Sequence, residues 1–240
     1  MQTRLDPKSY AEHWERESTL FDGNGIYRVL SEITPQGRVL EIGSGSGLAT
    51  LALASTREVL AIDSNVHLAH TARARLSTVG VAAEVLSVDV FEPSAQSVQA
   101  IKNFAPKVLA CWFIGSNADD QEKYVDASVP LRERAEKYRQ SVEDALFSKG
   151  LCPPSVEWVH LANRAGMVAG APEDFVKHEL KDDYDTHVFA PNGFEVVDVQ
   201  IFDWDTAGSS FKYVAAPNSD RLPSQSVAKL TSVLAKRKAP

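Results

Sequence analysis

Short apolar runs recur along the chain, and segments with helical spacing separate them. Five runs predict strands, and the fourth is continuous and apolar, as is typical of the middle of a sheet covered on both faces. A sixth run alternates apolar and polar residues and predicts a half-exposed strand, and a turn at Ala207 and Gly208 leads to a seventh. We expect the last two to pair as an antiparallel hairpin. The predicted strands are 38–42, 59–62, 83–88, 108–113, 156–161, 194–202 and 211–215.

Capping residues and helical spacing predict the helices between these strands. The Ser9 to Glu12 spacing is that of a capping box and predicts a helix that the residues 22–25 break. Ser64 is expected to cap a helix, Pro93 and Pro172 to begin two more, and apolar spacing predicts another helix over 131–146. The tail contains one amphipathic stretch, Val227 to Leu234, which we interpret as a docked helix or a frayed end.

Strands that alternate with helices and end in a hairpin predict an α/β fold with a mostly parallel sheet. At 240 residues the chain fits one such domain with some elaboration. We expect an N-terminal helical segment or lid over 1–25, a main domain over 26–216 and a C-terminal tail over 217–240.

The most informative motif follows the first predicted strand. Three glycines, Gly43, Gly45 and Gly47, alternate directly after that strand and precede an apolar, helix-compatible segment. A strand, a glycine turn and a helix together bring backbone N–H groups against a nucleotide-type ligand. Sixteen residues past Gly47 the second strand ends in Asp63, whose carboxylate can accept hydrogen bonds from both hydroxyls of a ribose.

These residues resemble the class I S-adenosylmethionine-dependent methyltransferases, in which an acidic residue precedes a G-x-G-x-G loop and another ends the second strand. Glu41 and Asp63 match those two acids. The resemblance implies a doubly wound sheet of seven strands, with the last inserted antiparallel beside the fifth. The dehydrogenase fingerprint fits less well, because its third glycine would fall at Leu48.

The resemblance also implies which residues bind S-adenosylmethionine. The glycine loop would line the methionine part, with Glu41 supporting the loop or reaching the amino group. Asp63 would take the ribose, Asp89 and Val90 the adenine, and Trp112 with Phe113 would wall the methyl-transfer face. The full expected cofactor set is Glu41, Gly43, Ser44, Gly45, Gly47, Asp63, Ser64, Asp89, Val90 and Trp112. The residues alone leave other roles open: Asp63 as a helix cap, Asp89 as a turn residue, Trp112 and Phe113 as core.

No catalytic residue is assigned from the sequence. His160 lies inside a strand and is read as a core histidine rather than a base, and His178 and His187 as surface residues. Asn163 and Arg164, at the end of the fifth strand, are better placed to touch an acceptor. We place the acceptor pocket among Trp112, Phe113, 116–130, Asn163, Arg164 and 205–210.

Two further readings concern the first helix and a metal. Tyr10, His13 and Trp14 are read as the apolar face of that helix, with a lid over the cofactor as the alternative. Asp119 and Asp120 look solvated, so no metal is assigned.

Charge and composition narrow the acceptor and the setting. A net charge of −7 argues against a broad nucleic-acid or anionic-membrane surface. We therefore expect a small-molecule acceptor, no DNA and no membrane. Two cysteines and the lack of a signal-like start favour the cytoplasm. A nucleotide-dependent oxidoreductase, a non-catalytic cofactor- or partner-binding protein, and a methyltransferase acting on protein or RNA are the alternatives.

Overall fold

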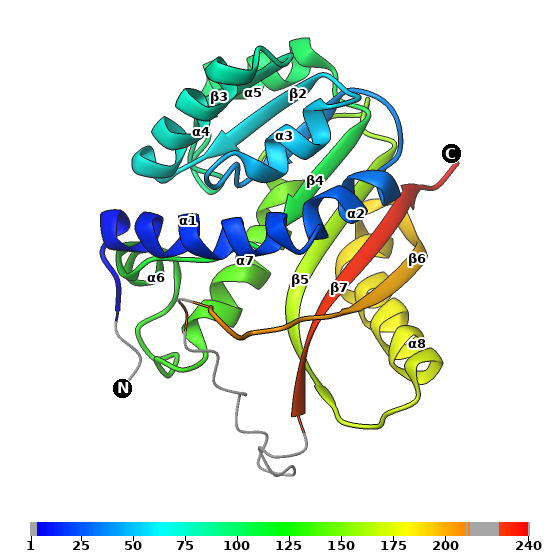
Figure 1. Ribbon diagram of the computed structural model, residues 1–240. Coiled ribbons are helices and arrows are strands. Elements are labelled where there is room, and N and C mark those ends of the chain that lie inside the picture. The colour runs from blue at the N-terminus through cyan, green and yellow to red at the C-terminus, as the bar shows by residue number, and fades with distance from the viewer. Residues whose placement is uncertain (1–3, 210, 212–225, 240) are drawn as a thin grey trace.

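The protein is built around one seven-stranded sheet in the order β3-β2-β1-β4-β5-β7-β6 (Figure 1). The computed structural model describes residues 4–209, 211 and 226–239. β1 to β5 run parallel, and β7 pairs antiparallel with both β5 and β6. The strands are β1 (Val39–Ile42), β2 (Val59–Asp63), β3 (Ala83–Ser87), β4 (Val108–Trp112), β5 (Trp158–Val168), β6 (Phe194–Asp203) and β7 (Ser226–Arg237).

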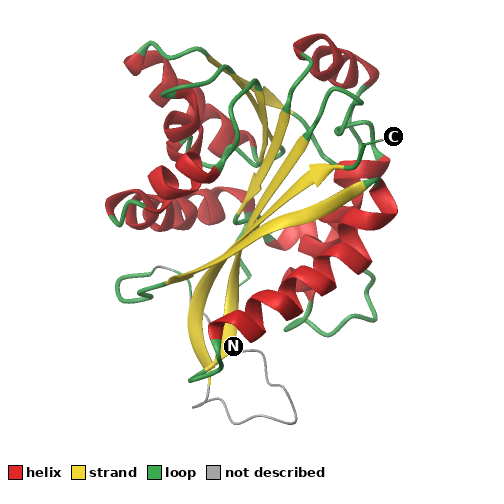
Figure 2. Cartoon of the chain, turned by 90° about the vertical axis from the view of Figure 1, so that its right-hand side faces the viewer, coloured by secondary structure: helices red, strands yellow, loops and turns green. Residues whose placement is uncertain are grey.

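Helices cover both faces of this sheet, as Figure 2 shows from the side. The helices are α1 (Pro7–Gly23), α2 (Ile26–Ile33), α3 (Leu48–Ala54), α4 (Val66–Val79), α5 (Ala95–Phe104), α6 (Ala118–Tyr124), α7 (Arg134–Ser148) and α8 (Glu173–Tyr184). A π-helical turn, η1 (Asp185–Phe189), and a 3-10 turn, η2 (Ala190–Asn192), follow α8. Among the described residues, no helix is long and apolar enough to cross a bilayer.

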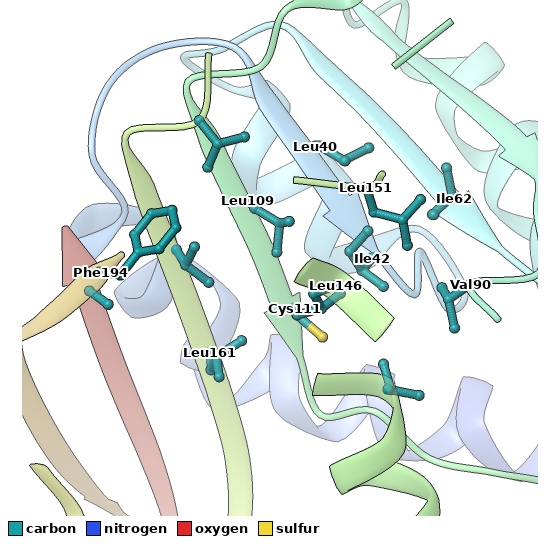
Figure 3. Close-up of a cluster of buried hydrophobic side chains, with 14 of the residues drawn as sticks. Leu40, Ile42, Ile62, Val90, Leu109, Cys111, Leu146, Leu151, Leu161 and Phe194 are labelled. Atoms are coloured by element: carbon teal, nitrogen blue, oxygen red, sulfur yellow. The ribbon is translucent and has the colours of Figure 1, made fainter. Parts of the chain in front are cut away.

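Alternate residues of the strands supply two separate cores. Leu40, Ile42 and Leu109 point to one face and pack with Leu146 of α7 and with residues around α5 and η1 (Figure 3). Val39, Val59 and Val108 point to the other face, against α1 to α4. Burial on both faces explains the continuous apolar runs of the central strands.

The predicted α/β, doubly wound, mostly parallel seven-strand sheet with an antiparallel C-terminal pair is confirmed. The position of its last strand is corrected. Residues 212–215 of the predicted hairpin strand lie outside the described residues, and the strand that pairs with β6 is β7, Ser226–Arg237. The interpretation of Val227 to Leu234 as a helix or a frayed end is therefore wrong.

Several helix ends also differ from the predictions. Asp6 rather than Ser9 caps α1, with Pro7 at the first helical position. Asn65 rather than Ser64 caps α4, accepting from the backbone N–H groups of His67 and Leu68. The polar stretch after β4 contains the short helix α6, which a capping box between Asn117 and Asp120 begins.

Candidate functional site

A small cavity lies at the carboxyl ends of β1, β2 and β4, where the strand order reverses between β1 and β4. In open α/β sheets this switch point is where ligands bind. The cavity has a volume of about 70 Å³. Its lining includes six residues singled out in the expected cofactor set: Gly43, Gly45, Asp63, Ser64, Val90 and Trp112.

Each of the three loop positions requires glycine for a structural reason. All three have positive φ, at 80°, 51° and 86° for Gly43, Gly45 and Gly47. A Cβ on Gly45 would overlap the indole Nε1 of Trp14, and one on Gly47 would lie 2.9 Å from the Cα of Ala72 in α4. Gly43 and Gly45 line the cavity, whereas Gly47 allows close packing between the loop and α4.

Asp63 links β2 to the glycine loop. One carboxylate oxygen accepts from the Gly45 N–H at 2.9 Å, and the other from the Asn65 N–H at 2.8 Å. Burial raises the pKa of Asp63 to about 6, and the two backbone N–H groups oppose this rise. Each oxygen keeps a further lone pair for a ligand. Since Asn65 caps α4, the alternative in which Asp63 serves only as that cap is not what the structure has.

A group of buried polar atoms surrounds the glycine loop without hydrogen-bond partners among the described residues. They are Oε2 of Glu41 and the hydroxyls of Ser44 and Ser46. Burial raises the pKa of Glu41 to about 8. Unpartnered buried polar groups are costly, so their concentration at one loop indicates a polar ligand or bound water there.

Asp89 and Val90 both follow β3, but they differ in whether they face the cavity. Val90 lines the cavity. The Asp89 carboxylate is already engaged, accepting from the Phe91 N–H at 3.0 Å, from the Tyr124 hydroxyl and from the Lys123 ammonium at 3.3 Å. Asp89 is absent from the cavity lining, although it was expected to face the adenine.

Trp112 and Phe113 both line the cavity and are both buried. Phe113 has a φ of 55°, a left-handed conformation that is unusual for a bulky residue and that concentrates at functional sites. Its N–H donates to the Ala162 carbonyl at 2.7 Å, and its ring stacks on Phe21 of α1 at 4.7 Å. These contacts hold the turn after β4 against the cavity.

The histidines do not lie at the cavity. His160 is fully buried, its ring nitrogens lie 2.8 Å from the hydroxyls of Thr34 and Ser232, and burial lowers its pKa to about 3. The interpretation of His160 as a core residue is therefore confirmed. His178 and His187 are exposed near Asp182 and Asp183 on and after α8, as expected of surface residues.

Of the two residues at the end of the fifth predicted strand, one adjoins the cavity. Asn163 is buried between α7 and α8, where its amide donates to Glu143 at 3.2 Å and to the Tyr184 hydroxyl at 2.8 Å. The Arg164 guanidinium lies over the ring of Trp14, 5.2 Å from its centroid, and close to the Phe113 carbonyl. Arg164 therefore stands beside the turn that carries Phe113.

Helix α1 forms a roof over the cavity through Tyr10 and Trp14, which both line it. Trp14 also belongs to the buried core and Tyr10 packs against that core, as expected of the apolar face of the helix. The Asn65 amide donates to the Pro7 carbonyl at 2.9 Å, and Arg75 bridges Glu15 of α1 to the Ser46 carbonyl of the glycine loop.

A second part of the roof comes from α6. The Ala118 N–H donates to the Leu5 carbonyl at 2.9 Å, and Arg4 pairs with Glu122 at 2.7 Å. Asn117 and Asp120 line the cavity. Asp120 was expected in solvent, and its capping-box spacing to Asn117 is the signal that indicates a helix at this point.

The cavity is smaller than the roughly 300–1,000 Å³ that small-molecule sites usually have. Tyr10 and Trp14 close it from α1, and Asn117 and Asp120 close it from α6. A nucleoside-sized ligand would therefore require the Tyr10 and Trp14 side chains of α1 to move outward. Among the described residues, no group of three or more His, Cys, Asp or Glu side chains is arranged to hold a metal.

No protein-family model and no curated protein sequence matches the chain. Solved structures do. The N-methyltransferase NodS from Bradyrhizobium japonicum, in complex with S-adenosyl-L-homocysteine, aligns with a TM-score of 0.53 over 98% of this chain and 100% of that one, at 10% identity. TrmN from Thermus thermophilus aligns with a TM-score of 0.50 over 89% of this chain and 48% of that one, at 13% identity.

A third similar structure is a candidate tRNA (m1A22) methyltransferase from Streptococcus pneumoniae. It has a TM-score of 0.50 and 11% identity, over 88% of this chain and 69% of that chain. Identities this low carry the fold and not the substrate. Strand order, the antiparallel β7 and these alignments agree: the chain has the Rossmann-like fold of the class I S-adenosylmethionine-dependent methyltransferases.

Proposed function

We propose that this protein is an S-adenosylmethionine-dependent methyltransferase that acts on a small molecule. The observation that carries the proposal is the glycine loop with its unpartnered buried polar atoms, hydrogen-bonded to Asp63 at the end of the neighbouring strand β2. A loop whose glycines admit close backbone approach, beside polar atoms that lack partners, fits a ligand with both an amino-acid and a nucleoside part.

The residues fit the cofactor as follows. Gly43, Ser44 and Gly45 would hold the methionine part, with Glu41 supporting them from below. Asp63 has free lone pairs for two hydroxyl donors and lies next to Ser64 in the lining. Val90 would meet the adenine, and Trp112 would stand at the methyl-transfer face. Gly47 acts through helix packing, and Asp89 acts by ordering Lys123 and Tyr124 rather than by direct contact.

The cofactor supplies the methyl group on a sulfonium, and the chain supplies alignment. Methyl transfer is a direct displacement, so the enzyme must fix donor and acceptor in line and exclude water. Trp14, Phe113 and Tyr10 form a largely aromatic wall able to do both. No catalytic base is assigned, and His160 does not serve as one because it is enclosed between Thr34 and Ser232.

A small acceptor is favoured by the net charge of −7 and by the enclosed, aromatic wall beside Arg164. The unpaired cysteines Cys111 and Cys152 fit a cytoplasmic setting. The second candidate is an RNA acceptor, because similar structures include a candidate tRNA methyltransferase. A cofactor- or partner-binding protein without transfer activity is the third.

Transfer of a labelled methyl group tests these candidates. The purified protein is incubated with methyl-labelled S-adenosylmethionine and, in parallel, with a small-metabolite extract, total protein, and nucleic acids. We expect label in the small-metabolite fraction, and its loss in the Asp63→Ala variant. Label in RNA that depends on Asp63 would replace the small-molecule assignment, and no label in any fraction despite cofactor binding would favour the non-catalytic candidate.

A further inference from the structure

Two carboxylates line the cavity, Asp63 and Asp120. Asp63 ends β2, and Asp120 lies in the first turn of α6. The capping box fixes Asp120 in place: its Oδ2 accepts from the Asn117 N–H at 3.1 Å, and the Asn117 side chain accepts from the Asp120 N–H at 3.0 Å. Among the described residues no hydrogen bond occupies Oδ1 of Asp120, so this oxygen is available to a donor in the cavity.

Asp120 and Asp89 are close enough to influence each other, yet only one faces the cavity. The pKa of Asp120 is raised, mainly by burial, with the charges of Asp89 and Asp119 adding to the rise, while the Asn117 N–H and Lys123 oppose it. Asp120 in turn adds to the raised pKa of Asp63. Asp120 therefore lies near both aspartates, while Asp89 is turned to Phe91, Lys123 and Tyr124.

The cavity wall near these groups is suited to a flat base. Ile62, Leu68 and Val90 contribute apolar surface to the lining. A purine stacked on such a wall needs polar partners only at its edge. An ionised carboxylate only accepts hydrogen bonds, so it recognises an amino group and rejects a carbonyl in the same position.

We propose that Asp120, and not Asp89, recognises the exocyclic amino group of the cofactor's adenine and so selects adenine over a 6-oxo purine. This inference rests on the proposed function, because it assumes S-adenosylmethionine or its product as the ligand. In the proposed complex, Asp63 binds the ribose of that ligand and the glycine loop binds its amino-acid part. The adenine amine is the donor that remains for the free oxygen of Asp120.

Calorimetric titration with two ligands tests the assignment. One is S-adenosylhomocysteine, and the other is its 6-oxo analogue, S-inosylhomocysteine. In the unchanged protein we expect the adenine ligand to bind about tenfold or more tightly than the analogue, the ratio that corresponds to about 1.4 kcal/mol. Asp120→Ala should weaken the adenine ligand by about tenfold and remove most of this preference.

Three further variants separate recognition from structure. Asp119→Ala removes a neighbouring exposed carboxylate from the same helical turn and should leave the preference unchanged, as should Asp89→Ala. Asp120→Asn keeps the size of the side chain and an oxygen for the capping box while adding an N–H donor. It should therefore improve binding of the 6-oxo analogue relative to Asp120→Ala. Thermal unfolding of each ligand-free variant reports whether α6 and the fold are kept.

The outcomes distinguish the two proposals. If the unchanged protein fails to bind S-adenosylhomocysteine, the proposed function is contradicted and this inference with it. If it binds, and Asp120→Ala or Asp120→Asn retains the full preference for adenine, the assignment to Asp120 alone is overturned. Loss of the preference in Asp89→Ala, with Asp120→Asn unaffected, would return the role to Asp89.

Discussion

Gly45 shows how one residue joins the loop to the helix above it. Its φ of 51° belongs to the left-handed region, and the indole of Trp14 occupies the space where a Cβ would be. The Gly45 backbone N–H also donates a hydrogen bond to the Asp63 carboxylate. A substitution at this position would therefore disturb the glycine loop, helix α1 and the Asp63 carboxylate together.

The first prediction compares two glycines of similar backbone conformation. Gly45→Ala should destabilise the fold by about 2–4 kcal/mol, because backbone strain adds to overlap with Trp14. Gly80→Ala is the matched control: its φ is 71°, with nothing within 4 Å of the added Cβ, so strain alone should cost about 1–2 kcal/mol. Denaturant unfolding measures both. Equal losses of unfolding free energy in the two variants would show that Trp14 does not lie close to Gly45.

The second prediction concerns Glu41 and pH. The pKa of Glu41 is about 8 in the folded protein against 4.5 as its ordinary value. The folded state then holds a proton that the unfolded state releases, so this contribution to stability is complete below 4.5 and is lost as pH rises through about 8. Glu41→Gln should flatten the fall in unfolding free energy between these pH values by about 1–3 kcal/mol.

Chemical unfolding of both proteins across that range checks the expectation. Asp63 remains in the variant, and its raised pKa of about 6 leaves a smaller slope of the same sign at lower pH. Parallel curves for the two proteins would contradict a buried, protonated Glu41.

At the scale of single residues, the sequence predicts part of the candidate site. Gly43, Gly45 and Asp63 follow predicted strands directly, so their meeting at one edge of the sheet could be inferred. Asp120 could not, because its direction depends on the capping box that begins α6 and on the way α6 packs. Asn163 was expected at the acceptor and instead turns to Glu143, since nothing in the sequence shows which neighbours a strand end will meet.

Among the elements, β7 differs most from the expectation. Its residues from Leu230 to Ala235 are all buried, polar Thr231 and Ser232 included, because β7 lies between β5 and β6 in the sheet. A strand buried on both faces shows no alternation, and Val227, Leu230 and Leu234 happen to lie at helical spacing. Only its pairing with β5, which is distant in the sequence, shows that this segment is a strand and not a helix.

A proline substitution tests the central position of β7. Val233 pairs with Leu161 of β5 and Val199 of β6, so proline there should remove a ladder hydrogen bond and cost about 3 kcal/mol or more. Ser226→Pro, at the first residue of the strand, is the control and should be tolerated far better. Equal, small effects on thermal unfolding would show that β7 does not pair on both sides.

Helix α1 and the start of α6 together determine access to the cavity. Contacts of Asn65 with Pro7, Arg75 with Glu15 and Arg4 with Glu122 hold the N-terminal segment to α4 and to α6. The sequence predicts a helix at the N-terminus, but the tertiary packing of Trp14 against the glycine loop decides that it is a roof.

For the whole molecule, the fold could be predicted more fully than the site. The alternation of strands and helices and the glycine loop imply a switch point between β1 and β4, and the cavity lies there. The acceptor could not be predicted, because fold similarity extends to structures named for RNA and for N-methylation alike. Physical recognition of the acceptor depends on side chains contributed by several loops.

The central claim is that the glycine-loop cavity binds S-adenosylmethionine and its product, and calorimetric titration with S-adenosylhomocysteine tests it most directly. We expect micromolar binding to the unchanged protein, a loss of about 1.5–3 kcal/mol in Asp63→Ala with the fold retained, and no heat from NAD. Binding of NAD in this cavity, or S-adenosylhomocysteine binding that is unaffected by Asp63→Ala, would contradict the account.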